Sequence, residues 1–255
     1  MSARKIEGSV ALVTGANRGI GRAITEALLT RGAKRVYATA RDPKTLEELT
    51  ARHGGRVVPL RLDVTDPHEV GQAARLAEDV ELLFNNAGVV EGKGLAGEEI
   101  VEQARREMEV NYLAPLRLLV RFADGLASRQ GAVVNLSSVA GLSNFAFFPT
   151  YSASKAAVHS LTQGARALFA SRGVSVIGVY PGPVDTDMAK EITLDKSSPR
   201  RGESHPRRRR DRSRRRLPGS VRRDLRGAVR VVSESLGAAA RGDGGGELRA
   251  RQGAR

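Results

Sequence analysis

The stretch Thr14-Gly-Ala-Asn-Arg-Gly-Ile-Gly21 decides the expected fold of this 255-residue chain. It closes an apolar run that starts at Val10 and opens a segment with helical spacing, Gly19–Arg31. Glycines let a backbone approach a pyrophosphate closely, and a helix N-terminus supplies free N–H groups and a positive dipole. The spacing Gly-x-x-x-Gly-x-Gly differs from the more common Gly-x-Gly-x-x-Gly, and an isolated match is often an ordinary turn. The strand before it and the helix after it favour a dinucleotide-binding turn.

The pattern of strand and helix continues along the chain. Short apolar or β-branched runs predict strands at Val10–Thr14, Arg35–Thr39, Val57–Leu62, Leu82–Asn85, Ala132–Leu136 and Val174–Tyr180. Helical spacing lies between them, at Gly19–Arg31, Lys44–His53, Pro67–Ala77, Glu98–Ser128 and Tyr151–Ser171. This alternation predicts the α/β class, with a Rossmann-like, doubly wound parallel sheet that has helices on both faces in a single domain.

Composition excludes several classes of protein and site. The chain has no cysteine, which excludes disulfides, a thiol nucleophile and a cysteine metal site. We expect no metal, because the four histidines are scattered without ligand spacing. No apolar run approaches the roughly 18 residues of a membrane span, and the N-terminus does not resemble a signal peptide. We therefore expect a cytoplasmic protein with no membrane partner.

The basic charge is concentrated in the C-terminal part of the chain. The net charge is +14, and residues 196–255 hold 19 basic and 6 acidic residues, so the remainder is nearly neutral. We expect a nucleotide-binding domain over residues 1–193 and a disordered, arginine- and glycine-rich tail over residues 194–255.

Three interpretations of the tail compete. It can be a solvated tail without a special function, or a basic arm that binds nucleic acid. It can also result from a reading-frame shift near Ser197–Arg201, because GC-rich codons read out of frame give mostly Arg, Gly, Ala and Pro. We favour the frame shift, and we expect no nucleic-acid partner except through this tail.

The end of the second predicted strand indicates which cofactor is bound. An acidic residue there would bind the ribose 2′-hydroxyl of NAD, whereas this chain has Arg41. The planar guanidinium of Arg41 can pair with a 2′-phosphate, and Arg18 in the glycine turn can assist. Asp42 is a competing signal for NAD. We therefore predict NADP in preference to NAD.

Tyr151 and Lys155 are the candidate reaction centre. They lie four residues apart and so share one helix face. A free tyrosine has a pKa near 10, too high for an efficient base, and a neighbouring ammonium lowers that pKa. An isolated Tyr-x-x-x-Lys pair is a weak signal, since a buried tyrosine beside a surface lysine gives the same pattern.

The order of motifs resembles the short-chain dehydrogenase/reductase superfamily in its shorter, carbonyl-reductase-like form. The motifs that match in order and spacing are the glycine turn, Asp63, Asn86-Ala-Gly88, Asn111, Ser137-Ser138, Tyr151, Lys155 and Pro181-Gly182. The resemblance covers about residues 6–190 and implies hydride transfer between NADPH and a carbonyl or secondary alcohol. It also implies a homo-oligomer acting on a small-molecule substrate.

The resemblance assigns a role to each catalytic residue. Tyr151 is the general acid/base and Lys155 lowers its pKa, while Asn111 holds a helix kink and a proton-relay water. Ser138 is chosen over Ser137 because it lies 13 residues before Tyr151, the family's usual spacing. The residues that we assign to the cofactor are Gly15, Asn17, Arg18, Gly19, Ile20, Gly21, Arg41, Asp63, Val64, Asn86, Ala87, Gly88, Tyr151, Lys155, Pro181, Gly182, Val184 and Thr186.

Two questions stay open at this level. Phe145, Phe147 and Phe148 either line an apolar substrate pocket or pack in a core or subunit interface. The alternative function is a weakly active or inactive nucleotide-binding protein whose basic tail binds nucleic acid.

Overall fold

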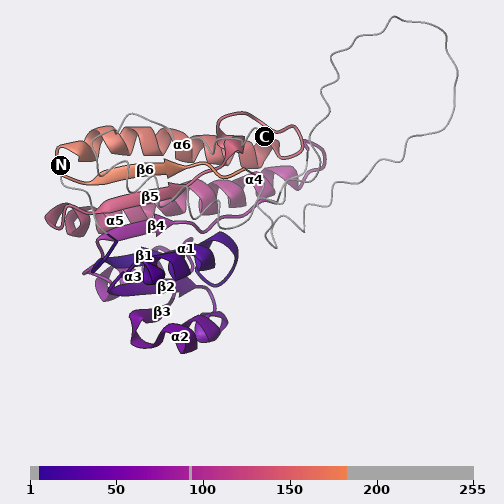
Figure 1. The fold of residues 1–255 in the computed structure, drawn as a ribbon. Helices are drawn as coiled ribbons and strands as arrows, with labels where there is room; N and C mark the ends of the chain where they lie inside the picture. Colours follow the sequence, from indigo (N-terminus) through magenta and orange to yellow (C-terminus); the bar gives the residue numbers. More distant parts are fainter. Residues whose placement is uncertain (1–5, 92–93, 183–255) are drawn as a thin grey trace, which may run out of the picture.

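The strands of the computed structural model, which describes residues 6–91 and 94–182, form one parallel sheet (Figure 1). They are β1 (Val10–Val13), β2 (Arg35–Ala40), β3 (Val57–Arg61), β4 (Leu82–Asn85), β5 (Ala132–Leu136) and β6 (Ser175–Val179). Their order is β3-β2-β1-β4-β5-β6, so the direction of winding reverses between β1 and β4. This confirms the predicted doubly wound, Rossmann-like sheet in a single domain.

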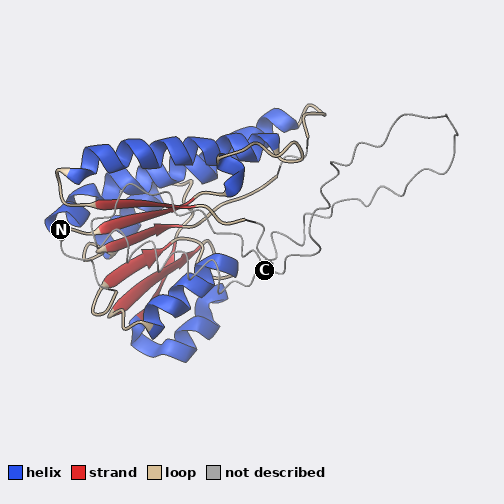
Figure 2. Cartoon of the chain, turned by 45° about the horizontal axis from the view of Figure 1, so that its top comes forward, coloured by secondary structure: helices blue, strands red, loops and turns tan. Residues whose placement is uncertain are grey.

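Helices cover both faces of the sheet (Figure 2). They are α1 (Gly19–Thr30), α2 (Glu47–His53), α3 (Pro67–Leu76), α4 (Ile100–Met108), α5 (Ala114–Ser128) and α6 (Pro149–Ala170). The first two pack their apolar side chains into one core, and α3, α5 and α6 pack into the core on the opposite face. The central strands are buried on both sides, as the continuous apolar runs predicted.

Local sequence explains where two of these helical segments begin. Asp66 caps α3, because its carboxylate accepts the backbone N–H groups of His68 and Glu69, and Pro67 supplies a preset φ at the first position. Asp42 accepts the N–H of Lys44 in the same way. The segment predicted as one helix over Lys44–His53 therefore starts as a 3-10 turn, Pro43–Leu46, before α2.

The helix predicted over Glu98–Ser128 is interrupted by a π-helical turn, Glu109–Leu113, between α4 and α5. The N–H of Ala114 donates to the carbonyl of Glu109, five residues earlier, instead of four. Asn111 lies inside this turn and is buried. The expected irregularity at Asn111 is present, and its form is a π turn rather than a sharp kink.

Within the described part of the chain, no helix combines the length and apolar character needed to cross a membrane. The basic tail predicted over residues 194–255 lies outside the described residues.

Candidate active site

The ends of β1 and β4 meet where the winding of the sheet reverses, and Thr14 joins them. Its Oγ1 accepts the N–H groups of Asn86 and Ala87, both at 2.9 Å. The Asn86 side chain donates back to the carbonyls of Thr14 at 2.8 Å and Gly15 at 3.2 Å. The Asn86 side chain thus holds the glycine turn in place, and the cofactor contact assigned to Asn86 stays a prediction.

The glycine turn leaves no room for side chains at its closest points. Gly15 and Gly19 have φ angles of 63° and 53°, which favour glycine. A Cβ on Gly21 would lie 2.1 Å from the Gly15 carbonyl oxygen and 2.5 Å from Asn86 Nδ2. The turn is therefore packed backbone against backbone at the N-terminus of α1, the arrangement that a pyrophosphate requires.

Arg18 and Arg41 lie exposed beside this turn, at the start of α1 and after β2. Neither guanidinium makes an ion pair among the described residues, whereas the nearby Arg61 is paired with Glu69 at 2.9 Å. Asp42, the competing signal for NAD, accepts the N–H of Lys44 at 3.0 Å. Two unpaired guanidinium groups beside an anion-binding turn fit a cofactor with an additional phosphate.

Asp63 follows β3, and the turn that comes after it holds its carboxylate by hydrogen bonds. Its Oδ1 accepts the N–H and the hydroxyl of Thr65 at 2.9 and 2.6 Å. Burial raises the pKa of Asp63, but the hydrogen bonds from Thr65 and the charges of Arg41 and Arg61 outweigh it, so the pKa lies below its ordinary value. Asp63 is therefore an ionised acceptor beside the buried Val64.

Gly88 brings the segment after β4 against two of the predicted catalytic residues. A Cβ on Gly88 would lie 3.1 Å from Asn111 Oδ1 and 3.3 Å from Lys155 Nζ. Asn111 Oδ1 accepts the N–H of Val89 at 2.9 Å, and its amide donates to the Val89 carbonyl and to Ser154 Oγ, each at 2.9 Å. Asn111 therefore fixes the segment after β4 to α6.

Ser138, Tyr151 and Lys155 converge between the end of β5 and the start of α6. Lys155 is buried, and its Nζ donates to the Leu136 carbonyl at 2.9 Å and lies 5.8 Å from the centre of the Tyr151 ring. The Ser138 hydroxyl interacts with the phenol of Tyr151 and accepts the N–H of Ala140 at 3.1 Å. Ser137 instead donates to the Lys155 carbonyl at 2.9 Å, which matches the structural position expected for it.

The electrostatics of this pair are set mainly by burial. Burial raises the pKa of Tyr151, the hydrogen bond with Ser138 lowers it, and the charge of Glu107 raises it, so the net shift is upward. Burial also lowers the pKa of Lys155 to about 8. In the protein alone, desolvation is the largest influence on the Tyr151 pKa, and the pKa-lowering effect of the Lys155 ammonium stays a prediction.

Pro181 and Gly182, the last residues that the structure describes, lie close to Ser138. The carbonyl of Pro181 accepts the N–H of Val139 at 3.1 Å, so Pro181 and Gly182 lie beside Ser138. Val184 and Thr186, which we assigned to the cofactor, lie outside the described residues.

Apolar side chains near the start of α6 are exposed. Phe147 is 67% exposed and Phe145 40%, so neither packs in the core of the described chain. The N–H of Gly94 donates to the Phe147 carbonyl at 3.1 Å, which places the segment that starts at residue 94 beside this loop.

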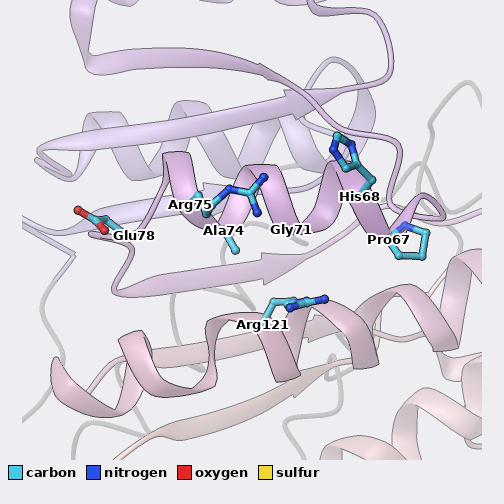
Figure 3. A pocket seen from close by; sticks show the side chains of 7 residues that line it. All are labelled: Pro67, His68, Gly71, Ala74, Arg75, Glu78 and Arg121. Carbon is cyan, nitrogen blue, oxygen red and sulfur yellow. The ribbon is translucent and has the colours of Figure 1, made fainter.

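A separate hollow of about 480 Å³ lies between α3 and α5, lined by residues that include Arg75, Arg121 and His68 (Figure 3). Its lining shares no residue with the predicted site, so it does not belong to the reaction centre. The described residues contain no cluster of three or more His, Asp or Glu side chains that could hold a metal ion.

Sequence reasoning missed three residues that build the site: Thr14, Ser154 and Glu107. Thr14 directly precedes the first glycine of the turn, and Ser154 stands inside Tyr151–Lys155, so their positions were a usable signal. Glu107 gave no signal, since a glutamate on a helix is usually solvated.

Comparisons with known proteins point in the same direction. A family model described as short chain dehydrogenase matches residues 9–197. The chain is 37% identical over 192 residues to the 3-oxoacyl-[acyl-carrier-protein] reductase FabG of Vibrio cholerae, covering 73% of this chain and 78% of that protein.

Solved structures are similar as well. A short chain dehydrogenase from Burkholderia cenocepacia, in complex with NADP, is 43% identical with a TM-score of 0.70, covering 74% of this chain and 78% of that one. A short-chain dehydrogenase from Streptomyces avermitilis is 35% identical with a TM-score of 0.66, covering 71% and 68%.

Proposed function

The chain belongs to the short-chain dehydrogenase family, whose oxidoreductases act on CH–OH groups, and from this premise we propose that it is an NADPH-dependent carbonyl reductase. The observation that carries the proposal is the gathering of Ser138, Tyr151 and Lys155 beside Gly88 and Asn111. These residues lie at the carboxyl ends of β4 and β5, next to the glycine turn, where open α/β sheets bind ligands.

The residues present fit NADP. Gly15 and Gly21 leave the backbone approach open, and Arg18 and Arg41 are the guanidinium groups that would hold the 2′-phosphate. The Burkholderia cenocepacia relative was solved in complex with NADP, which supports the same assignment. When bound, the nicotinamide supplies the hydride, and the protein supplies orientation and the proton.

The proton comes from the Tyr151 hydroxyl. A tyrosine is protonated at neutral pH, and the upward shift of the Tyr151 pKa leaves it so, so the proton that the reduction of a carbonyl to an alcohol consumes is present. Ser138 orients the substrate oxygen toward this hydroxyl, and the Lys155 amine lies behind the phenol ring, held by Leu136. Asn111 holds the backbone of Val89, in the segment that follows β4, in place while the proton is transferred.

The substrate class that we propose is a neutral, apolar carbonyl compound. Phe145 and Phe147 are exposed at the start of α6, and residues 142–149 carry no charge. The name of the Vibrio cholerae relative, a 3-oxoacyl reductase, supports a ketone on an apolar chain.

Assembly and location remain predictions. Val120 on α5 and Leu168 on α6 are 65% and 73% exposed, which supports a homo-oligomer that buries these helices. We retain the cytoplasm as the expected location.

We also propose that the gene or its recorded sequence leaves the family reading frame near Ser197–Arg201. In support, the family match ends at residue 197, where the arginine-rich composition begins. Sequencing the gene tests this proposal. The proposal requires that a one-nucleotide shift at this point restore an open frame with helical patterning, and it fails without one.

The decisive experiment for the main proposal measures NADPH oxidation over a panel of aliphatic and aromatic ketones and aldehydes. Tyr151→Phe removes the proton donor, so kcat/KM should fall by about 10²–10⁴-fold while NADPH still binds. Tyr37→Phe is the matched control, because Tyr37 bonds to Asp79 on the far side of the sheet from α1 and should leave turnover unchanged. Tight NADPH binding without turnover of any carbonyl would overturn the proposal.

A further inference from the structure

Glu107 is a buried carboxylate that the proposed mechanism does not use. It lies on α4 with no exposed surface, one helical turn before Asn111. A glutamate is almost never fully buried unless its carboxylate is paired with a charge or accepts hydrogen bonds.

The first use is a hydrogen bond to the segment after β4. Glu107 Oε1 accepts the N–H of Glu91 at 2.8 Å, and Asn111 binds both backbone groups of Val89. The two side chains, four residues apart on one helix face, thus hold alternate residues of the same extended segment. That segment begins at Gly88, which touches Lys155 and Asn111, so Glu107 fixes the outer end of the wall beside the reaction centre.

The second use is electrostatic. The charge of Glu107 raises the pKa of Tyr151, because a nearby anion disfavours the phenolate. Among the described residues, the Lys155 amine lies 5.8 Å from the centre of the Tyr151 ring, and the charged side chains of Glu91 and Arg106 lie beside the Glu107 hydrogen bond. Arg106 is bound to the Glu91 carboxylate at 2.6 Å, so its charge is directed to the solvent side.

We propose that Glu107 is a positioning residue of the reductase, which fixes the Gly88–Glu91 wall through its hydrogen bond to the Glu91 N–H and acts on the Tyr151 hydroxyl through its charge. This inference rests on the proposed function for its meaning, since the wall and the Tyr151 hydroxyl matter to catalysis only if Tyr151 transfers a proton to a carbonyl compound. It extends that function by naming the group that sets its pH range.

Three variants separate the two uses. Glu107→Gln keeps the size and an oxygen that can accept the Glu91 N–H but removes the charge. Glu107→Asp keeps the charge but shortens the reach to Glu91. Glu102→Gln is the matched control, because Glu102 lies exposed on the same helix and pairs with Arg105.

The first readout is the pH profile of kcat/KM for carbonyl reduction. In Glu107→Gln the alkaline limb should move to lower pH by about half a unit or more, because the negative charge that disfavours the Tyr151 phenolate has been removed. Glu102→Gln should leave the limb in place. Glu107→Asp should also keep it, while raising the Kd for NADPH by about tenfold through the loosened wall. An unshifted limb in a folded Glu107→Gln protein would overturn the proposal.

The second readout does not need turnover. The chain has no tryptophan and four tyrosines, so tyrosinate absorption can be titrated directly, and subtraction of Tyr151→Phe isolates the signal of Tyr151. The Tyr151 transition should move to lower pH in Glu107→Gln. If it moves although no carbonyl is reduced, the proposed function fails and the inference on Glu107 stands. If turnover is present and the transition does not move, the reverse holds. Should Glu107→Gln not fold, the same titration of Glu107→Asp must retain the wild-type transition, and a shift there would contradict the proposal.

Discussion

The candidate functional side chains differ in exposure and in hydrogen bonding between the two halves of the sheet. In the first half, β1 to β3, Arg18 and Arg41 are exposed and make no ion pair among the described residues. In the second half, β4 to β6, Asn111 and Lys155 are buried and already hydrogen-bonded to the protein. The half that would bind the phosphates leaves charges open for a ligand, whereas the half that would perform the chemistry holds its groups rigidly without one.

This difference indicates how the side chains of each half affect the stability of the folded protein. Unpaired surface arginines cost little in water, and their energy is gained when an anion binds. The buried amine of Lys155 costs stability at neutral pH, because desolvation disfavours its charged form. The exposed binding arginines can therefore be exchanged with small effects on folding, while substitution of the buried Lys155 should change the free energy of unfolding.

The largest expected effect tests that cost in the catalytic half. Burial lowers the pKa of Lys155 to about 8, whereas an unfolded lysine has a pKa near 10.4. Below pH 8 both states bind the proton. Between about pH 8 and 10 the unfolded state binds more protons, so the free energy of unfolding should rise with pH, by up to about 3 kcal/mol. Urea unfolding at pH 7 and pH 9.5, without cofactor, measures this rise.

Lys155→Met removes the titrating amine, so its unfolding free energy should lack that rise with pH. The difference between wild type and variant is the quantity to compare, since other groups titrate equally in both. Parallel pH profiles for the two proteins would contradict a buried, destabilising amine at Lys155.

The next effect concerns the backbone of the cofactor half. Gly21→Ala places a Cβ 2.1 Å from the Gly15 carbonyl oxygen, so the turn must move, at a cost of about 1–3 kcal/mol. NADPH affinity, measured by fluorescence titration, should fall by at least tenfold. The same substitution at Gly164 is the control, because a Cβ there meets nothing within 4 Å. Gly164→Ala should stabilise α6 by about 0.5–1 kcal/mol and leave NADPH binding unchanged. Equal effects at both positions would argue against a closely packed turn.

The smallest effect concerns the open charges of the cofactor half. Arg41→Ala should lower the preference for NADPH over NADH by about tenfold, the size of one exposed charged hydrogen bond. The melting temperature should not change, because Arg41 makes no ion pair among the described residues. Arg31→Ala is the control, since Arg31 is also exposed but lies at the far end of α1. A preference that stays constant in Arg41→Ala would remove the case for a 2′-phosphate contact there.

The sequence predicted the architecture closely because strand ends and helix starts are local signals. The strands Leu82–Asn85 and Ala132–Leu136 were predicted with their observed bounds. The helices predicted over Lys44–His53 and Glu98–Ser128 are each divided by a turn, and the other elements differ by one or two residues at their ends. The grouping of Ser138, Tyr151 and Lys155 followed from the resemblance, and the three side chains lie together in the structure.

What the sequence could not supply were properties that depend on burial and on long-range contacts. The side-chain amide of Asn86 donates to the carbonyls of Thr14 and Gly15, a contact across about seventy residues that spacing could not predict. The direction of the Tyr151 pKa shift depends on desolvation and on Glu107, neither of which can be read from spacing. Both are outcomes of packing rather than of local pattern.

The π-helical turn at Glu109–Leu113 amounts to one inserted residue in the helical frame. An α-helix advances about 100° per residue, so deleting one residue here would restore a regular helix and rotate everything before it relative to α5. Glu107 would then be rotated relative to α5 and to the segment after β4 that it binds. Insertions and deletions in this short stretch should therefore be tolerated far less than substitutions on its solvent side, and alignments of related sequences should place no gap within it.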